Sequence, residues 1–164
     1  MTMAPNHPAP VAAPATDVTA LLPSREAVLA RLADQMPSAD AMPATLVVVG
    51  LLRRDDGWPT PQSTLAQVTS LLARSLRGDD WLASSGPAEF VIVMGGSATG
   101  AQVAADRLVA AVQALGIPGL SAAAGLAPLS SDLSAGEALR RATVSLTAAR
   151  RVGAGTVVQH RLPY

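Results

Sequence analysis

The sequence contains no cysteine and no lysine, and its aromatic residues are limited to two tryptophans, one tyrosine and one phenylalanine. Without cysteine the chain cannot form a disulfide, a thiolate nucleophile or a cysteine-ligated metal centre. The two histidines, His7 and His160, lie far apart and lack the spacing of a metal-ligand pair. These absences exclude disulfide and thiol chemistry, and the two histidines form no metal-ligand cluster in the sequence.

Charge is also scarce, because twelve arginines are balanced by twelve acidic residues and the net charge is zero. This balance argues against binding to a nucleic-acid polymer or to an anionic membrane surface. It still allows a few placed arginines to recognise one small anionic ligand. Apolar runs such as residues 46–52 are far too short to span a bilayer, and the N-terminus lacks signal-peptide features. We expect a soluble, cytoplasmic protein without membrane insertion.

Composition divides the chain into two parts. Residues 1–16 are rich in proline and alanine and show no helical or strand period, which predicts a disordered tail. Residues 17–164 are long enough for one domain, and about half of the whole chain is apolar, which is enough for a core.

Hydrophobic periodicity predicts alternating helices and strands in the domain. Residues 45–52 form a short, continuous apolar run, which is typical of a strand buried on both faces. Ser24 and Ser134 are expected to cap helices, the latter in a capping box with Glu137. The predicted order is helix 24–36, strand 45–52, helix to about 77, a hairpin whose strands 81–83 and 89–94 are joined by a Ser-Ser-Gly-Pro turn, helix 98–115, strand within 117–126, helix 134–152 and strand 156–161. The pattern predicts an α/β domain with a mixed sheet.

Four segments in fixed order resemble the GGDEF family of diguanylate cyclases. They are DVTALLPSR at residues 17–25, GPAEF at 86–90 in place of the GGDEF motif itself, SAAAGLA at 121–127 and TAARRVGAG at 147–155. The resemblance spans residues 17–160. It implies the palm-like nucleotidyl-cyclase fold, in which a central, mixed and mostly antiparallel sheet is flanked by helices.

The positions that carry catalysis in the family have changed in this chain. The first metal-binding aspartate corresponds to Gly50, and the acid two residues later is Leu52. Pro87 and Ala88 stand where the motif has glycine and aspartate. The aspartate that reads guanine corresponds to Gln62, and the terminal lysine to Arg150, which we expect on an exposed helix face. Glu89 is expected to be a solvated carboxylate. Because metal carboxylates are central to phosphoryl transfer, we expect a degenerate active site, no enzyme activity, and no metal or other cofactor.

The family's product-inhibition site, called the I-site, has been retained in sequence. Its R-x-x-D motif matches Arg77 and Asp80 without a gap, and its second arginine matches Arg107. An arginine fork can donate two hydrogen bonds to guanine O6 and N7, and a carboxylate can accept from guanine N1–H and N2–H. The resemblance therefore implies that Arg77, Asp80 and Arg107 bind cyclic di-GMP, a bacterial second messenger, and that the chain is a non-catalytic receptor. Its further partner would be an unidentified protein or a second copy of the chain.

Two other functions remain open from the sequence. The chain could be a nucleotide-free protein-interaction scaffold, in which Arg77 and Arg107 pair with local acids such as Asp79 and Asp106. It could also be an inactive domain that still binds GTP at the position of the family's active site. The placement of these arginines in the fold separates the first alternative from the receptor hypothesis.

Overall fold

The computed structural model describes residues 21–53 and 60–161. These residues form four α-helices, one short 3₁₀-helix and five strands. In chain order they are α1 Arg25–Gln35, the 3₁₀-helix Met36–Ser38, β1 Ala44–Arg53, α2 Gln62–Ser75, β2 Trp81–Gly86, β3 Glu89–Gly95, α3 Ala98–Ala114, β4 Leu120–Pro128, α4 Ala135–Val152 and β5 Val157–Gln159. The predicted order of elements is confirmed. The expected tail, residues 1–16, lies outside the described residues.

The five strands form one mixed sheet in the order β2-β3-β1-β4-β5. All neighbouring strands are antiparallel except β4 and β5, which run parallel. β1 is therefore the central strand, and β2 and β5 are the two edges. The predicted α/β class, with a mixed and mostly antiparallel sheet, is confirmed.

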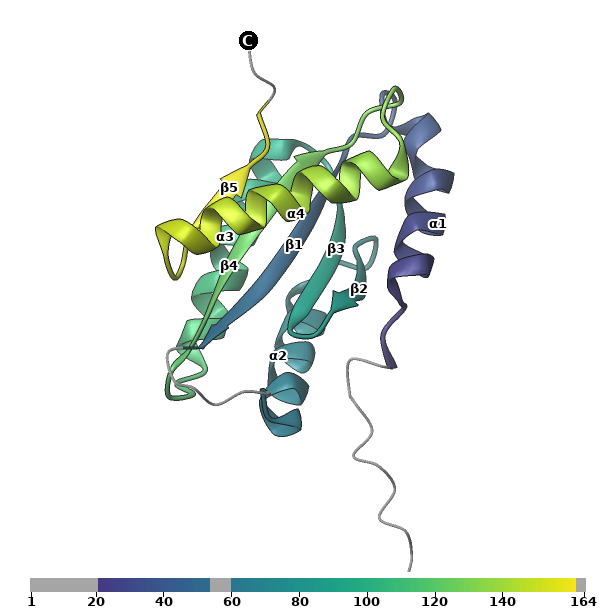
Figure 1. Ribbon diagram of the computed structural model, residues 1–164. Coiled ribbons are helices and arrows are strands. Elements are labelled where there is room, and N and C mark those ends of the chain that lie inside the picture. The colour runs from purple at the N-terminus through teal and green to yellow at the C-terminus, as the bar shows by residue number, and fades with distance from the viewer. Residues whose placement is uncertain (1–20, 54–59, 162–164) are drawn as a thin grey trace, which may run out of the picture.

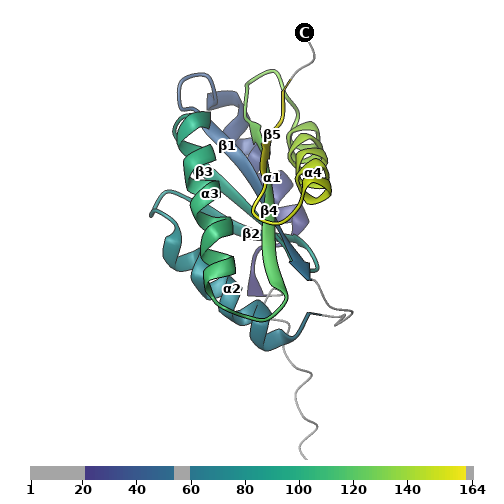
Figure 2. The same ribbon diagram turned by 90° about the vertical axis from the view of Figure 1, so that its left-hand side faces the viewer.

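Helices cover both faces of the sheet (Figure 1). Viewed towards the β5 edge, α2 and α3 lie on one side and α4 lies on the other (Figure 2). β1 alternates between the two layers, since Val47 and Val49 join the core under α2 and α3 while Leu46 and Val48 join the core under α1 and α4. This is why the strand is a continuous apolar run instead of an alternating one.

Local sequence sets the helix ends. Ser24 caps α1 and Ser134 caps α4, each accepting a hydrogen bond from the third residue of its helix. The expected capping box at α4 forms only in part. The Glu137 backbone N–H donates to Ser134 Oγ, but the Glu137 carboxylate accepts from Arg140 and Arg141 instead of the Ser134 backbone. Within the described residues, no helix is both long and apolar enough to cross a membrane.

Candidate functional site

The predicted ligand residues Arg77 and Asp80 lie together in a tight turn between α2 and β2. Asp80 Oδ2 accepts a hydrogen bond from the Arg77 backbone N–H at 3.0 Å, and the Asp80 N–H donates to the Arg77 carbonyl at 3.1 Å. These reciprocal bonds fix the position of the two Cα atoms relative to each other. The aspartate thus holds the turn with one oxygen.

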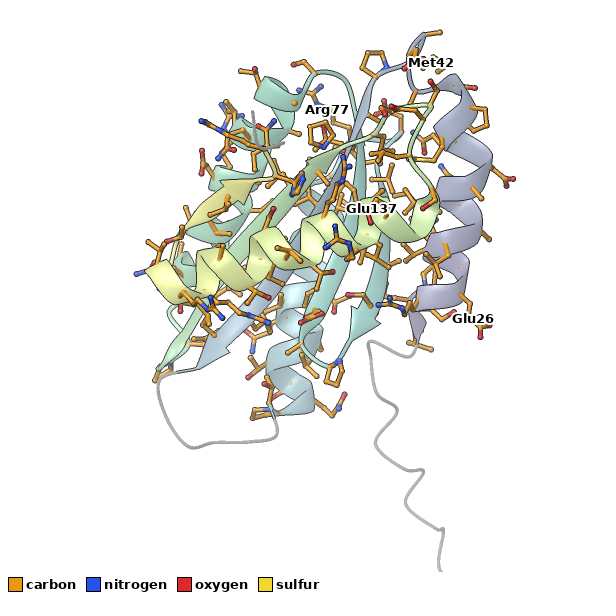
Figure 3. All side chains as sticks on the ribbon, turned by 45° about the horizontal axis from the view of Figure 1, so that its top comes forward. Glu26, Met42, Arg77 and Glu137 are labelled. Carbon is orange, nitrogen blue, oxygen red and sulfur yellow. The ribbon has the colours of Figure 1, made fainter. Side chains whose placement is uncertain are left out.

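The side chains at this turn differ in exposure. Arg77 is exposed and Asp80 is half-buried. Gly78 has open space around the position that a Cβ would occupy, whereas Asp79 lies against Gly95 at the end of β3, 3.2 Å from where a Cβ there would be. Figure 3 labels Arg77 at this turn. It also labels Glu137, which lies on α4, the helix on the opposite face of the sheet. The Arg77 side chain is therefore exposed to solvent just after the end of α2.

Arg107, the third predicted ligand residue, is an exposed residue of α3. α3 packs beside α2 on the same face of the sheet, and the turn follows the end of α2. Among residues 21–53 and 60–161, no hydrogen bond or ion pair joins Arg107 directly to Arg77 or Asp80. The fold brings Arg77 and Asp80 into contact and places Arg107 on the neighbouring helix.

Neither arginine is neutralised by the nearby acids. In the described part of the chain the ion pairs join Arg140 and Arg141 to Glu137, and Arg150 to Glu89. Asp79 and Asp106 form no ion pair with Arg77 or Arg107. The arrangement in which local acids occupy these arginines is thus not the one observed.

A second site lies across the middle of the sheet, at Gly50. In β1, Gly50 pairs with Glu89 of β3 on one side and with Ala123 of β4 on the other. A Cβ built on Gly50 would lie 2.8 Å from Cζ and 2.9 Å from Nε of Arg150. The guanidinium of Arg150 therefore occupies the space into which a side chain at position 50 would extend.

Arg150 is held there by Glu89. Arg150 Nη1 donates to Glu89 Oε1 at 3.1 Å, and the two side chains are 31% and 25% exposed. Ser85 Oγ donates to the second carboxylate oxygen, Oε2, at 3.4 Å. The expectations of a solvated Glu89 and of an Arg150 on an exposed helix face are both wrong, because these side chains meet over Gly50 and partly bury each other.

The hairpin tip is also shaped unlike a flexible glycine loop. Ala88 is buried and adopts a left-handed backbone with φ of 57°, and its carbonyl accepts a hydrogen bond from the Leu51 N–H at 3.0 Å. Pro87 beside it is exposed and has no N–H to offer a phosphate. The tip is thereby tied to β1, next to Gly50.

The donor set at this position does not fit a divalent metal. Mg²⁺ is held in proteins by carboxylates and other oxygen ligands. Positions 50, 52 and 88 carry glycine, leucine and alanine, and the remaining carboxylate, Glu89, is bound to a guanidinium. Within residues 21–53 and 60–161 no group of three histidine, cysteine or acidic side chains is arranged to bind a metal ion.

Sequence reasoning missed the contact between Arg150 and Glu89, although both residues were singled out. A signal was present, since Gly50 is the only glycine in the apolar run 46–52. A glycine inside a buried strand often marks a site where another group approaches closely. What the sequence could not show is that α4 brings Arg150 to that glycine.

Comparison with known proteins depends on structure alone. No protein-family model matches the sequence, and no curated protein matches it either. Solved structures do match. The GGDEF domain of PA1120 (YfiN or TpbB) from Pseudomonas aeruginosa has a TM-score of 0.75 at 20% identity, covering 87% of this chain and 99% of that one.

Two further structures carry ligands or partners. The GGDEF domain of DgcB from Caulobacter crescentus in complex with c-di-GMP has a TM-score of 0.73 at 18% identity, covering 85% of this chain and 91% of that one. The diguanylate cyclase SiaD of Pseudomonas aeruginosa, in complex with its activator SiaC, has a TM-score of 0.73 at 18% identity. The match covers 84% of this chain and 58% of SiaD. The resemblance seen in the sequence is thus confirmed at the level of the fold.

Proposed function

We propose that this chain, which has the fold of GGDEF domains, is a non-catalytic receptor for cyclic di-GMP that regulates a protein partner. Arg77, Asp80 and Arg107 bind the ligand in this proposal. The observation that carries it is the Arg77–Asp80 turn, which is closed by two reciprocal hydrogen bonds while both arginines remain unpaired with acids in the described residues.

The chemistry of the turn suits guanine. The Arg77 guanidinium is exposed and can donate two parallel hydrogen bonds to O6 and N7 of the base. Asp80 uses Oδ2 to hold the turn, and Oδ1 remains to accept from N1–H or N2–H. Arg107, on the adjacent helix, would bind a second base or a phosphate.

The site at Gly50 supports the absence of catalysis. Phosphoryl transfer in cyclases depends on metal ions that neutralise developing charge on the phosphates. Here a guanidinium lies over Gly50 and is bound by the one carboxylate left nearby. This arrangement also argues against the alternative in which GTP binds at the position of the family's active site.

The structural neighbours are consistent with a regulatory role. The DgcB domain binds c-di-GMP, and SiaD binds an activator protein. A second-messenger receptor of this kind would act in the cytoplasm and transmit ligand binding to a protein or to a second copy of the chain.

Calorimetric titration of cyclic di-GMP into the full chain tests the proposal. Arg77→Ala should weaken cyclic di-GMP binding about tenfold to a hundredfold, because the charge-assisted bidentate hydrogen bonds of the guanidinium are lost. Arg151→Ala is the matched control, since Arg151 is an exposed arginine of α4 on the opposite face of the sheet. It should bind as the wild type does.

Other outcomes identify the alternatives. Absence of binding to the wild type would overturn the proposal and leave a nucleotide-free protein-interaction scaffold. Equal weakening by both substitutions would show that the effect is general electrostatics. Conversion of GTP to cyclic di-GMP in the presence of Mg²⁺ would refute the non-catalytic part alone.

A further inference from the structure

The free edge of β5 has backbone groups that no neighbouring strand of the described sheet uses. β5 is the last strand in the sheet order and pairs only with β4. The Thr156 carbonyl accepts from the Ala124 N–H at 3.0 Å, and the His160 N–H donates to the Leu126 carbonyl at 2.7 Å. Because successive residues of a strand turn their N–H and C=O groups to opposite edges, Val157 and Gln159 direct both groups away from β4.

A hollow flanks this edge on each face of the sheet. The hollow on the α4 side has a volume of about 440 Å³, and the residues that line it include Leu129, Leu133, Arg141, His160 and Arg161. The hollow on the α3 side has a volume of about 590 Å³ and is lined by Thr99, Gln102, Val157, Val158, Gln159 and Arg161. Figure 2 shows β5 facing the viewer between α3 and α4.

These two hollows match the geometry of an added strand. Side chains of a strand alternate between the faces of its sheet. A peptide that hydrogen-bonds to Val157 and Gln159 would therefore place successive side chains in the α3-side hollow and the α4-side hollow in turn. This is the arrangement in which main-chain bonds give affinity and flanking pockets give specificity.

Charge identifies the kind of peptide. The hollows contain arginines and a histidine and no acidic side chain, and Arg161 lines both of them. Arg161 forms no ion pair within the described ranges. Arg141 is ion-paired with Glu137, which accepts from its Nε at 3.1 Å, so Arg161 is the arginine of the two hollows that has no acidic partner in the described ranges.

We propose that the free edge of β5 is a docking site for an extended, acidic segment of a partner protein, which adds to the sheet as a sixth strand. A second copy of this chain fits less well, because an edge-to-edge dimer would bring Arg161 and His160 of both copies to the same interface. The site involves none of the proposed ligand residues and is independent of nucleotide binding.

The test uses a capped peptide that alternates glutamate and valine, titrated into the full chain and followed by amide chemical shifts. Gln159→Pro removes an outward-facing N–H and no bond to β4, as proline on an edge strand can do. It should weaken peptide binding about tenfold or more, since a main-chain hydrogen bond is lost and the ring blocks the edge. Gln159→Ala keeps the N–H and is the matched control, expected within about twofold of the wild type.

If Gln159→Pro does not fold, a second variant still tests the proposal. Arg161→Glu should lose the glutamate–valine peptide and gain a lysine–valine peptide that the wild type does not bind. Equal binding to the proline and alanine variants, or no shift of residues 157–161 with the acidic peptide, would overturn the proposal. A dimer of the free chain that Gln159→Pro dissociates would also overturn it, by assigning the edge to a second copy.

Discussion

At the scale of single residues, the main contact over the central strand is the ion pair between Arg150 and Glu89. The guanidinium lies over Gly50, in the space that any larger side chain there would need. Both partners are only partly exposed, and Ser85 provides a further hydrogen bond to the carboxylate. The pair ties the end of α4 to the start of β3 across the central strand.

Removing this cation should destabilise the fold modestly. Arg150→Ala leaves Glu89 half-buried without its partner, and we expect a loss of about 1 kcal/mol, in the range of partly exposed ion pairs. The free energy of unfolding in urea measures it. Arg151→Ala, the next residue along and exposed, should change stability by less than about 0.5 kcal/mol. Equal losses in the two variants would contradict the role given to the pair.

Glu137 should make the stability depend on pH. Hydrogen bonds from Arg140 and Arg141 lower its pKa from 4.5 to about 2. A carboxyl whose folded pKa is depressed stabilises the fold above its unfolded pKa and loses that contribution as pH falls. Glu137→Gln should therefore lower the melting temperature at neutral pH, and the difference should shrink below about pH 4.5 and vanish near pH 2. A difference that stays constant from pH 7 to pH 2 would contradict this account.

How far single residues can be predicted from sequence depends on whether their partners are local. Arg77 and Asp80 are three positions apart, so their contact follows from the turn chemistry of the chain itself. Glu89 and Arg150 are separated by 61 positions. Their contact depends on how α4 crosses the sheet, and no local pattern encodes that crossing.

At the scale of elements, the packing of α4 on β4 depends on a single glycine. A Cβ on Gly125 would collide with backbone atoms of α4, including the Ser145 carbonyl carbon at 2.7 Å. Backbone cannot rotate aside as a side chain can, so the helix would have to move. This close approach also explains the small residues on the same face of β4, since Ala123 and Ala127 are buried in the core under α1 and α4.

Gly125→Ala should therefore lower the free energy of unfolding by at least about 2 kcal/mol, as overpacking of a close-packed core does. Gly136→Ala is a matched control in α4, since nothing lies within 4 Å of its added Cβ. It should stabilise the protein by a few tenths to about 1 kcal/mol through helix propensity. Chemical denaturation measures the free energy of unfolding of both variants. If Gly125→Ala leaves that free energy unchanged, α4 packs less closely on β4 than described.

The elements themselves were predicted well because their signals are local. The apolar run 45–52 predicted a strand buried on both faces, and β1 has that position between β3 and β4. The strand at 81–83 was predicted too short, because Ser84 and Ser85 were assigned to the turn. They extend β2 to Gly86, where Ser84 donates to the Gly86 carbonyl and the register shifts. Serine favours turns by itself, and cross-strand pairing overrides that preference.

At the scale of the whole molecule, the fold separates three surfaces. The Arg77–Asp80 turn and Arg107 lie with α2 and α3, the Arg150–Glu89 pair crosses β1 under α4, and the free edge of β5 lies at the far end of the sheet from β2. The order of motifs along the chain was sufficient to predict this fold. The position of Arg107 relative to the turn was not predictable, because it depends on the packing of α2 against α3 and not on spacing.

The separation of the ligand turn from Gly50 allows the central claim to be tested in one titration. Cyclic di-GMP is titrated calorimetrically into the full chain with Mg²⁺, once alone and once with GTP in large excess. The account predicts saturable binding with the same affinity in both, because the Arg77, Asp80 and Arg107 site does not overlap the position that Arg150 fills. No binding, or binding that GTP displaces, would contradict the proposal that this chain is a cyclic di-GMP receptor at that site.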